Sequence, residues 1–211
     1  MSTPSDPRTL VMHGLRLKGF AEAAGVAEAV GVVAAEAKPV LDELVAEGLA
    51  TYRTGRISGF TLSPAGRAEH VSLLAIELEA AGARETLHAA YQRFLRLNTD
   101  LLTVCTAWQL CEVNGASTPN DHTDSAYDAE VIARLASLHA HVEPICAELA
   151  TLLHRFGGYG TRLSFALGQL QSGKLDFFTK PMVPSYHTVW FELHEDLLVT
   201  LGIERGSEGE G

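Results

Sequence analysis

Residues 35–67, AEAKPVLDELVAEGLATYRTGRISGFTLSPAGR, contain an ordered series of helix and strand signals. Apolar residues in the first third recur at helical spacing and end at Gly48, a residue suited to the left-handed backbone that terminates helices. Residues 49–53 and 59–62 are typical of two short strands, and the polar tip between them contains the glycine that a tight hairpin favours. Ser63-Pro64 then predicts a new helix, with Ser63 as N-cap and Pro64 at the first helical position.

This order of a helix, a hairpin with a basic tip and a capped helix is the core of a winged helix-turn-helix domain. Residues 10–18 and 20–30 predict two shorter helices that would support the helix of the quoted stretch. The helix from Pro64 to about residue 81 leads to a domain boundary at Gly82. We therefore expect a winged helix-turn-helix domain with a two-stranded wing over residues 8–82.

The rest of the chain carries no convincing strand signal. Its apolar periodicity predicts helices over about 83–107, 122–156, 159–171 and 184–201, with a loop at 111–120 and a kink or break at Pro144. We therefore expect a mainly α protein, with an all-helical bundle over residues 83–204 for ligand sensing or dimerisation. The tail over 205–211, which ends in GSEGEG, should be disordered.

Composition is that of an ordinary soluble domain rather than a membrane or secreted protein. The 211 residues contain no apolar run of roughly 18 residues, the length that a membrane span requires, and residues 1–10 lack the pattern of a signal peptide. Cys105, Cys111 and Cys146 are an odd number at unrelated spacings, so we expect reduced thiols in a cytoplasmic protein, with a redox sensor as the alternative.

The stretch GLATYRTGRISGFTLSPAGRAEH resembles the hairpin and following helix of winged-helix bacterial transcriptional regulators of the MarR-like type. Where that family has Leu-Thr-x-x-Gly-Arg, residues 62–67 read Leu-Ser-Pro-Ala-Gly-Arg. The resemblance covers about residues 10–80 and implies a homodimer that binds double-stranded DNA, with the third helix in the major groove and the wing on the backbone or minor groove. Carried over by position, the groove face comprises Ala35, Lys38, Pro39, Asp42 and Ala46, with Arg53 and Arg56 on the wing. The expected DNA-binding residues are Arg16, Lys18, Lys38, Arg53 and Arg56.

The negative charge of the chain supports an alternative to DNA binding. The chain has a net charge of −10, and residues 1–82 contain seven Lys/Arg against ten Asp/Glu. The groove face lacks the Arg, Gln, Asn and Ser that usually recognise base edges, and Asp42, Glu43 and Glu47 would repel phosphates. A continuous positive surface through Arg16, Lys18, Arg53 and Arg56 would favour DNA, whereas an interrupted one would favour a winged-helix module that binds protein.

Polar residues lie on inward or marginal faces of the predicted helices in the second half. Asp124 and Asp128 share the apolar stripe of their helix, although both could instead lie in its exposed first turn, where acids are favoured. Asn98 is in mid-stripe, either as a ligand contact or as a satisfied core amide. His187 and His194 are at the margin of the last helix, whose Glu192 and Asp196 are expected to face solvent.

A small-molecule pocket would combine these groups with nearby aromatic residues. The expected ligand-binding residues are Asn98, Trp108, Asp124, Tyr127, Asp128, Tyr186, His187, Trp190 and His194. A divalent metal at Asp128, His187 and His194 remains an alternative. The sequence thus favours a ligand-responsive DNA-binding transcriptional regulator that is not an enzyme. The alternatives are the protein-interaction module and, third, an enzyme that uses the inward Asp/His cluster.

Overall fold

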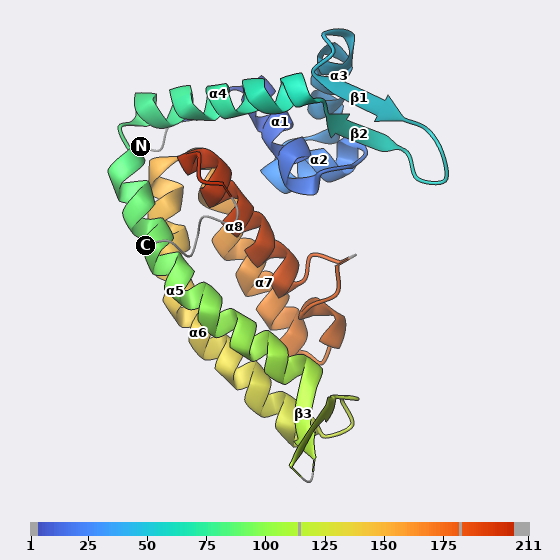
Figure 1. The fold of residues 1–211 in the computed structure, drawn as a ribbon, viewed down its shortest axis with the longest axis vertical. Coiled ribbons are helices and arrows are strands. Elements are labelled where there is room, and N and C mark those ends of the chain that lie inside the picture. Colours follow the sequence, from blue (N-terminus) through green and yellow to red (C-terminus); the bar gives the residue numbers. More distant parts are fainter. Residues whose placement is uncertain (1–3, 114, 182, 205–211) are drawn as a thin grey trace. The chain divides into compact units, whose positions relative to one another are not determined.

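The computed structural model describes residues 4–113, 115–181 and 183–204 (Figure 1). This part of the chain is mainly α-helical, as predicted, and its strands form two short antiparallel hairpins. The described chain divides into two compact units. Residues 4–87, 150–158 and 192–204 form the first unit, and the second consists of the described residues in 88–149 and 159–191. The tail predicted to be disordered, 205–211, lies outside the described residues.

The first unit begins with the elements that the quoted stretch and its upstream residues predict. In chain order these are α1 (Pro7–Lys18), α2 (Ala23–Val30), α3 (Ala34–Ala46), β1 (Ala50–Arg53), β2 (Gly59–Leu62) and α4 (Pro64–Ala81). The strands pair in register from Ala50 opposite Leu62 to Arg53 opposite Gly59. A boundary at Gly82 does not separate the units, because residues 150–158 and 192–204 also belong to the first one.

The start of α4 is fixed by the residues that the sequence singles out. The Ser63 side chain accepts a hydrogen bond from the Gly66 backbone N–H at 3.0 Å, and Pro64 occupies the first helical position. A Cβ atom on Gly66 would lie 1.9 Å from the backbone oxygen of Leu49. Glycine at this position therefore allows the first turn of α4 to pack directly on the chain that enters β1.

The core of the first unit is built from α1, α2, α3 and the hairpin. Its buried apolar side chains are Val11, Met12, Leu15, Val26, Ala27, Ala37, Leu41, Leu44, Leu49, Ala50, Phe60 and Leu62. An isolated antiparallel bridge between Ala21 and Phe60 joins the segment before α2 to the hairpin. The hairpin is thus held to the helices while its tip, with the exposed Ile57, remains accessible to solvent.

The remaining elements run from α5 to α8. They are α5 (Arg84–Gln109), β3 (Leu110–Val113), β4 (Ala116–Pro119), α6 (Ser125–Leu152), η1 (His154–Gly158), α7 (Tyr159–Gln171), η2 (Leu175–Phe177) and α8 (Tyr186–Leu201). The helices predicted from apolar periodicity are all present. Pro144 lies inside α6 and does not interrupt it, so of the two predicted outcomes, a kink or a break, the break is wrong.

The prediction that this half is all-helical is also wrong, because β3 and β4 form a hairpin where a loop was expected. Val113 pairs with Ala116, and Asn114-Gly115 stands between them in the sequence. This dipeptide is among the most favourable for a two-residue hairpin turn. The polar residues Glu112 and Ser117 interrupt apolar alternation in the strands, so the strand pattern is weak although the turn signal is strong.

Three helices contribute residues to both units. Residues 84–87 of α5, 150–152 of α6 and 192–201 of α8 belong to the first unit, and the remaining parts of these helices belong to the second. Within the described chain, each helix is either too short or too polar to cross a lipid bilayer.

Candidate functional site

The exposed face of α3 is the surface on which the expected DNA contacts would lie. Lys38 supplies the positive charge of this face, and its Nζ lies 2.6 Å from Asp42 Oδ2. Both side chains are exposed, so the pair forms in water one helical turn apart. The predicted groove lysine is therefore bound to an acid of its own helix, next to the exposed Glu43.

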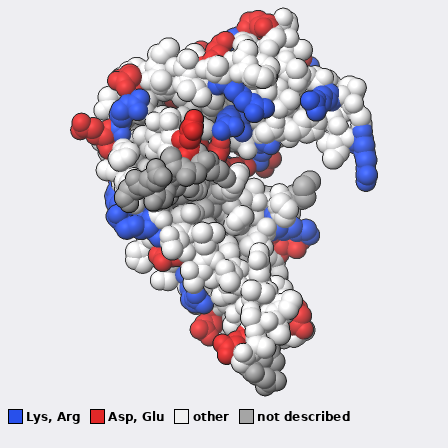
Figure 2. Space-filling view, in the orientation of Figure 1, with Lys and Arg blue, Asp and Glu red and all other residues white. Residues whose placement is uncertain are grey.

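The two cations expected on α1 are also paired with carboxylates. Arg16 Nη2 lies 2.6 Å from Glu195 Oε1, and Lys18 Nζ lies 2.7 Å from Glu192 Oε1. In Figure 2 the Lys and Arg side chains on the visible face form separate patches rather than one field. The positive surface from Arg16 through Lys18 to the wing is thus interrupted by the protein's own acids.

The cations of the hairpin, unlike those of α3 and α1, are not paired with carboxylates in the described chain. Arg53 and Arg56 are exposed, and in the described chain neither has a carboxylate within ion-pair distance. Arg67, which the sequence reading did not select as a binding residue, lies in the first turns of α4 and makes a long contact of 3.5 Å from Nη2 to the Leu62 carbonyl oxygen. The cations without acidic partners are therefore on the hairpin side of the first unit.

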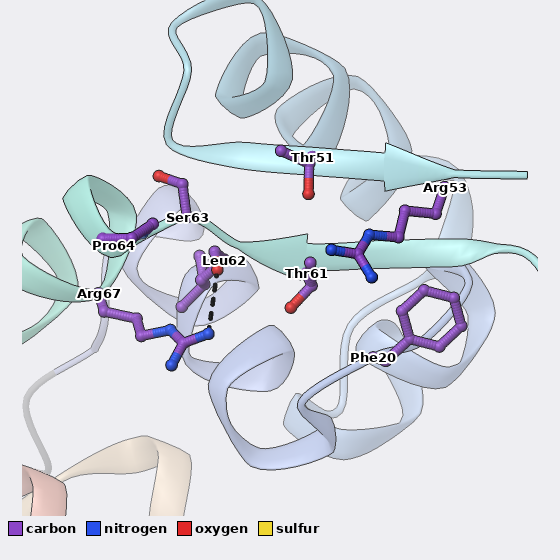
Figure 3. Close-up of a pocket in the computed structure, with 8 residues that line it drawn as sticks. All are labelled: Phe20, Thr51, Arg53, Thr61, Leu62, Ser63, Pro64 and Arg67. Carbon is purple, nitrogen blue, oxygen red and sulfur yellow. Dashed lines mark hydrogen bonds between the residues drawn. The ribbon is translucent and has the colours of Figure 1, made fainter.

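A pocket lies between the hairpin and the start of α4 (Figure 3). It has a volume of about 550 Å³. Its lining residues are Phe20, Thr51, Arg53, Thr61, Leu62, Ser63, Pro64 and Arg67. In Figure 3 the side chains of Arg53 and Arg67 lie on either side of Thr61. The lining contains two guanidinium groups and no acid, so its electrostatic character is positive.

A buried ionic network occupies the interior of the first unit. Arg155 in η1 donates from Nε to Glu77 Oε2 of α4 at 2.9 Å, pairs through Nη1 with Asp196 of α8, and donates from Nη2 to Thr200 Oγ1 at 2.6 Å. His13 Nε2 of α1 lies 3.0 Å from the second Asp196 oxygen. Burial opposes ionisation of Asp196, but Arg155 and His13 outweigh it and hold the Asp196 pKa well below its usual range.

The expectation that Asp196 and Glu192 face solvent is therefore wrong. Their relative exposures are 0% and 3%. The side of α8 opposite its apolar stripe also packs against protein, and the charged groups on it are buried because they meet Arg155 and Lys18. Burial of a charge is tolerated when a partner of opposite charge replaces the lost hydration.

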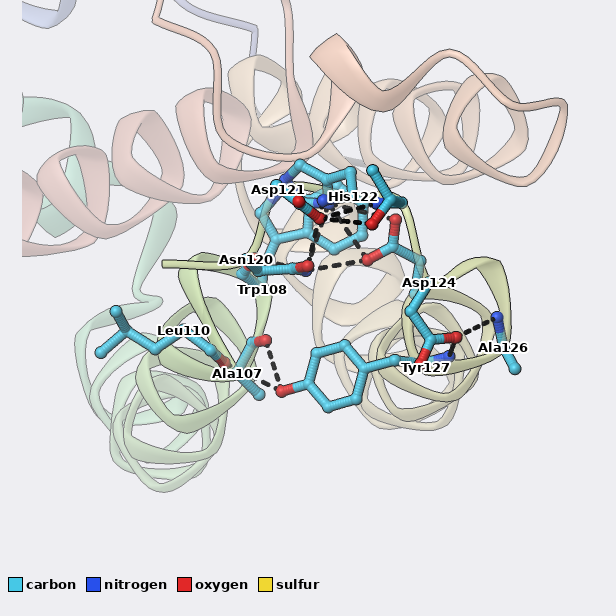
Figure 4. A network of polar contacts seen from close by, with 11 residues as sticks. Ala107, Trp108, Leu110, Asn120, Asp121, His122, Asp124, Ala126 and Tyr127 are labelled. Atoms are coloured by element: carbon cyan, nitrogen blue, oxygen red, sulfur yellow. Dashed lines mark hydrogen bonds and ion pairs between the residues drawn. The ribbon is translucent and has the colours of Figure 1, made fainter. Parts of the chain in front are cut away.

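The second unit contains a polar cluster that joins α5 to the start of α6 (Figure 4). Asp128 is buried, and its Oδ1 accepts a hydrogen bond from Asn120 Nδ2 at 2.9 Å and lies 3.0 Å from His122 Nδ1. The His122 ring packs on Trp108 with a centroid distance of 4.3 Å. Asn120 and His122 are not among the predicted site residues, although both lie a few residues before Asp124 and Asp128 in the sequence.

Asp124 and Asp128 have different roles. Asp124 lies at the exposed start of the helix and Asp128 faces inward, which are the two alternatives for this pair. Asp124 is exposed and accepts hydrogen bonds from the Ala126 and Tyr127 backbone N–H groups at 3.0 and 3.1 Å, so it caps α6. Asp128 is the inward member. The Tyr127 hydroxyl donates to the carbonyl oxygens of Ala107 and Leu110 at 2.8 and 2.9 Å.

Among the other predicted ligand-binding residues, Asn98, Tyr186 and Trp190 lie together. Trp190 Nε1 donates to Asn98 Oδ1 at 2.9 Å, so Asn98 is a satisfied amide. The rings of Trp190 and Tyr186 lie 6.2 Å apart. His187 is half-buried, which lowers its pKa. The structure thus brings Trp108 together with Asp128 and Asn98 together with Trp190, and His194 belongs to the first unit.

Among the described residues, no three His, Cys, Asp or Glu side chains are arranged to hold a metal ion. The three cysteines are free thiols, as expected, and Cys105 and Cys146 are buried. Burial raises the pKa of the Cys105 thiol to about 11, which keeps it protonated and unreactive at neutral pH.

Comparison with known proteins gives no match: neither a family model, nor a curated protein, nor a solved structure is similar to this chain at a significant level.

Proposed function

We propose that residues 8–82 form a winged helix-turn-helix module, and that its exposed α3 face binds a basic surface of another protein. The order of α1, α2, α3, β1, β2 and α4, with the hairpin packed beside α3, supports the winged-helix assignment. The observation that carries the choice of partner is the ion pair of Lys38 with Asp42, in which the acid offsets the positive charge of the helix that would enter a DNA groove.

The exposed face of α3 carries a net negative charge. Glu36 and Glu43 are exposed on α3, and no described cation forms an ion pair with either side chain. A DNA groove lined by phosphates would repel these carboxylates, whereas Lys or Arg side chains of a protein would complement them. Arg16 and Lys18 do not restore a positive surface, because each is paired with a glutamate of α8.

The test is affinity capture with charge-reversal variants of the full chain. The double variant Glu36→Lys/Glu43→Lys should lose the proteins that the wild type captures from a lysate of its source cells. The matched control Glu130→Lys/Glu112→Lys changes the net charge equally in the second unit and should retain them. Cross-links from α3 to a Lys/Arg-rich segment of the captured protein would identify the interface. If both double variants capture the same proteins, the α3 face is not the binding surface.

A ligand-responsive, homodimeric DNA-binding regulator is the second candidate. The observation that favours it is the absence of acidic partners for Arg53, Arg56 and Arg67 among the described residues. In that case Arg56→Ala should weaken binding to all duplex sequences alike and reduce the slope of log affinity against log salt by about one. Fluorescence anisotropy with the protein's own promoter region at low salt tests this, and light scattering measures whether the complex contains a dimer. No binding at low salt would exclude this candidate.

A further inference from the structure

The pocket beside the hairpin contains the groups that recognise phosphate. Arg53 comes from the end of β1 and Arg67 from the first turns of α4, so two different elements bring the guanidinium groups to one hollow (Figure 3). Their planar forks match the oxygens of a phosphate group, with two parallel hydrogen bonds to each fork. Neither arginine has an acidic partner in the described chain. Arg67 Nη2 makes a long contact of 3.5 Å to the Leu62 carbonyl oxygen, which leaves its other N–H groups for a ligand.

The hydroxyl groups of the lining show which donors remain for a ligand. Thr61 donates to the Gly19 carbonyl oxygen at 2.8 Å, and Ser63 donates to the Gly48 carbonyl oxygen at 2.8 Å. Thr51 makes no side-chain hydrogen bond within the described residues. The donors available to an anion are therefore Thr51 and the two arginines, and no lining carboxylate opposes it.

The same hollow has an apolar wall. Phe20 is 38% exposed and lines the pocket together with Leu62 and Pro64. A volume of about 550 Å³ is within the range of about 300 to 1,000 Å³ that small-molecule sites occupy, and a phosphate group alone would not fill it. A ligand that combines a phosphate with a small apolar or aromatic body fits both parts of the lining.

We propose that this pocket, formed by the hairpin, Phe20 and the start of α4, binds the phosphate monoester of a small organic molecule. Arg53 and Arg67 hold the phosphate, and Phe20 packs against the organic part. The acidic α3 of the same unit favours such a ligand over a nucleic-acid backbone. Glu36, Asp42 and Glu43 would repel a chain of phosphates extending past the pocket, but they would have little effect on a single phosphate seated within it.

Isothermal titration calorimetry of the full chain with phenyl phosphate, and with inorganic phosphate, tests the proposal. Phenyl phosphate should bind the wild type, and Arg53→Gln or Arg67→Gln should weaken binding about tenfold or more, because each removes a charge-assisted contact. Arg56→Gln is the matched control, since Arg56 is on the hairpin but outside the pocket lining. Phe20→Ala should reduce the preference for phenyl phosphate over inorganic phosphate and leave the affinity for inorganic phosphate unchanged.

Three outcomes would overturn the proposal. One is that the wild type does not bind phenyl phosphate at millimolar concentrations. Another is that Arg56→Gln weakens binding as much as Arg53→Gln and Arg67→Gln do, which would indicate a diffuse charge effect. The third is that a short DNA duplex binds more tightly than phenyl phosphate, displaces it and loses affinity in the same pocket variants. The pocket would then be a contact for a nucleic-acid backbone. Because both pocket arginines are exposed, the variants should fold normally, and circular dichroism checks this.

Discussion

Arg155 joins three elements of the first unit through its buried contacts with Glu77, Asp196 and Thr200. Replacing it with Met keeps most of the side-chain volume but removes the guanidinium group from the carboxylates of Glu77 and Asp196. We expect Arg155→Met to lower the free energy of unfolding by about 3 to 5 kcal/mol, measured by urea denaturation. The control Arg84→Met removes an exposed ion pair with Glu79 and should cost far less. Equal losses would show that the buried network contributes no more than a surface pair.

His70 makes stability depend on pH in a defined direction. Its ring is fully buried next to His13, and burial, with the electrostatic effect of the neighbouring His13 and Arg155, lowers the His70 pKa from 6.5 to about 3. Between these values the unfolded chain binds a proton that the folded chain does not. The free energy of unfolding therefore falls as pH falls below 6.5, by about 1.4 kcal/mol per pH unit from this residue.

The measurement for His70 compares the slopes of the free energy of unfolding against pH, because a loss of stability that is equal at every pH does not change this slope. Urea unfolding of the wild type and of His70→Gln at pH 7, 6 and 5 should give a shallower pH dependence for the variant. His88→Gln replaces an exposed histidine and should retain the wild-type slope. If the free energy of unfolding of His70→Gln depends on pH as steeply as that of the wild type, His70 is not the group that remains neutral in the folded state.

The sequence predicts that a polar residue is buried only when that residue lies on the apolar face of its helix. Asn98 and Asp128 were expected inside from 100° periodicity, and both are hydrogen-bonded there. Asp196 was placed in solvent because periodicity assigns one buried face to a helix. α8 is buried on the opposite face as well, and the partner that makes this tolerable, Arg155, is 41 residues away in the sequence. Local patterns contain no information about such a partner.

At the scale of single elements, the same substitution at two glycines should have opposite effects. A Cβ on Gly66 in α4 would lie 1.9 Å from the Leu49 oxygen, so Gly66→Ala must displace the start of α4 from the hairpin. A Cβ on Gly168 in α7 would meet no atom within 4 Å. We expect Gly168→Ala to raise the midpoint of thermal unfolding through a gain of about 0.5 to 1 kcal/mol, and Gly66→Ala to lower it. A rise in both would show that α4 can shift without cost.

Elements with strong end signals were predicted closely, and those without them were not. α4 starts at Pro64 and ends before Gly82 as expected, because a cap and a left-handed glycine act within a few residues. The hairpin of β3 and β4 was missed because its strands are short and partly polar, although its turn sequence is favourable.

For the whole molecule, a single ligand pocket lined by the expected residues stays a prediction. Trp108 and Asp128 both contact His122, Asn98 is hydrogen-bonded to Trp190, and His194 belongs to the first unit. Periodicity predicts which side of a helix is inward, but the rotation and depth of each helix decide which inward groups meet. The pocket beside the hairpin was missed for the same reason, since Arg53 and Arg67 come from different elements.

The two units should unfold together, because three continuous helices contribute residues to both. The chain has two tryptophans, Trp108 and Trp190, and both are in the second unit, so their fluorescence reports on that unit alone. Arg155 is in the first. If unfolding is cooperative, Arg155→Met should shift the urea midpoint of tryptophan fluorescence as far as it shifts the midpoint of far-ultraviolet circular dichroism. If the units unfold independently, the fluorescence midpoint will stay at its wild-type value while the circular dichroism curve divides into two transitions.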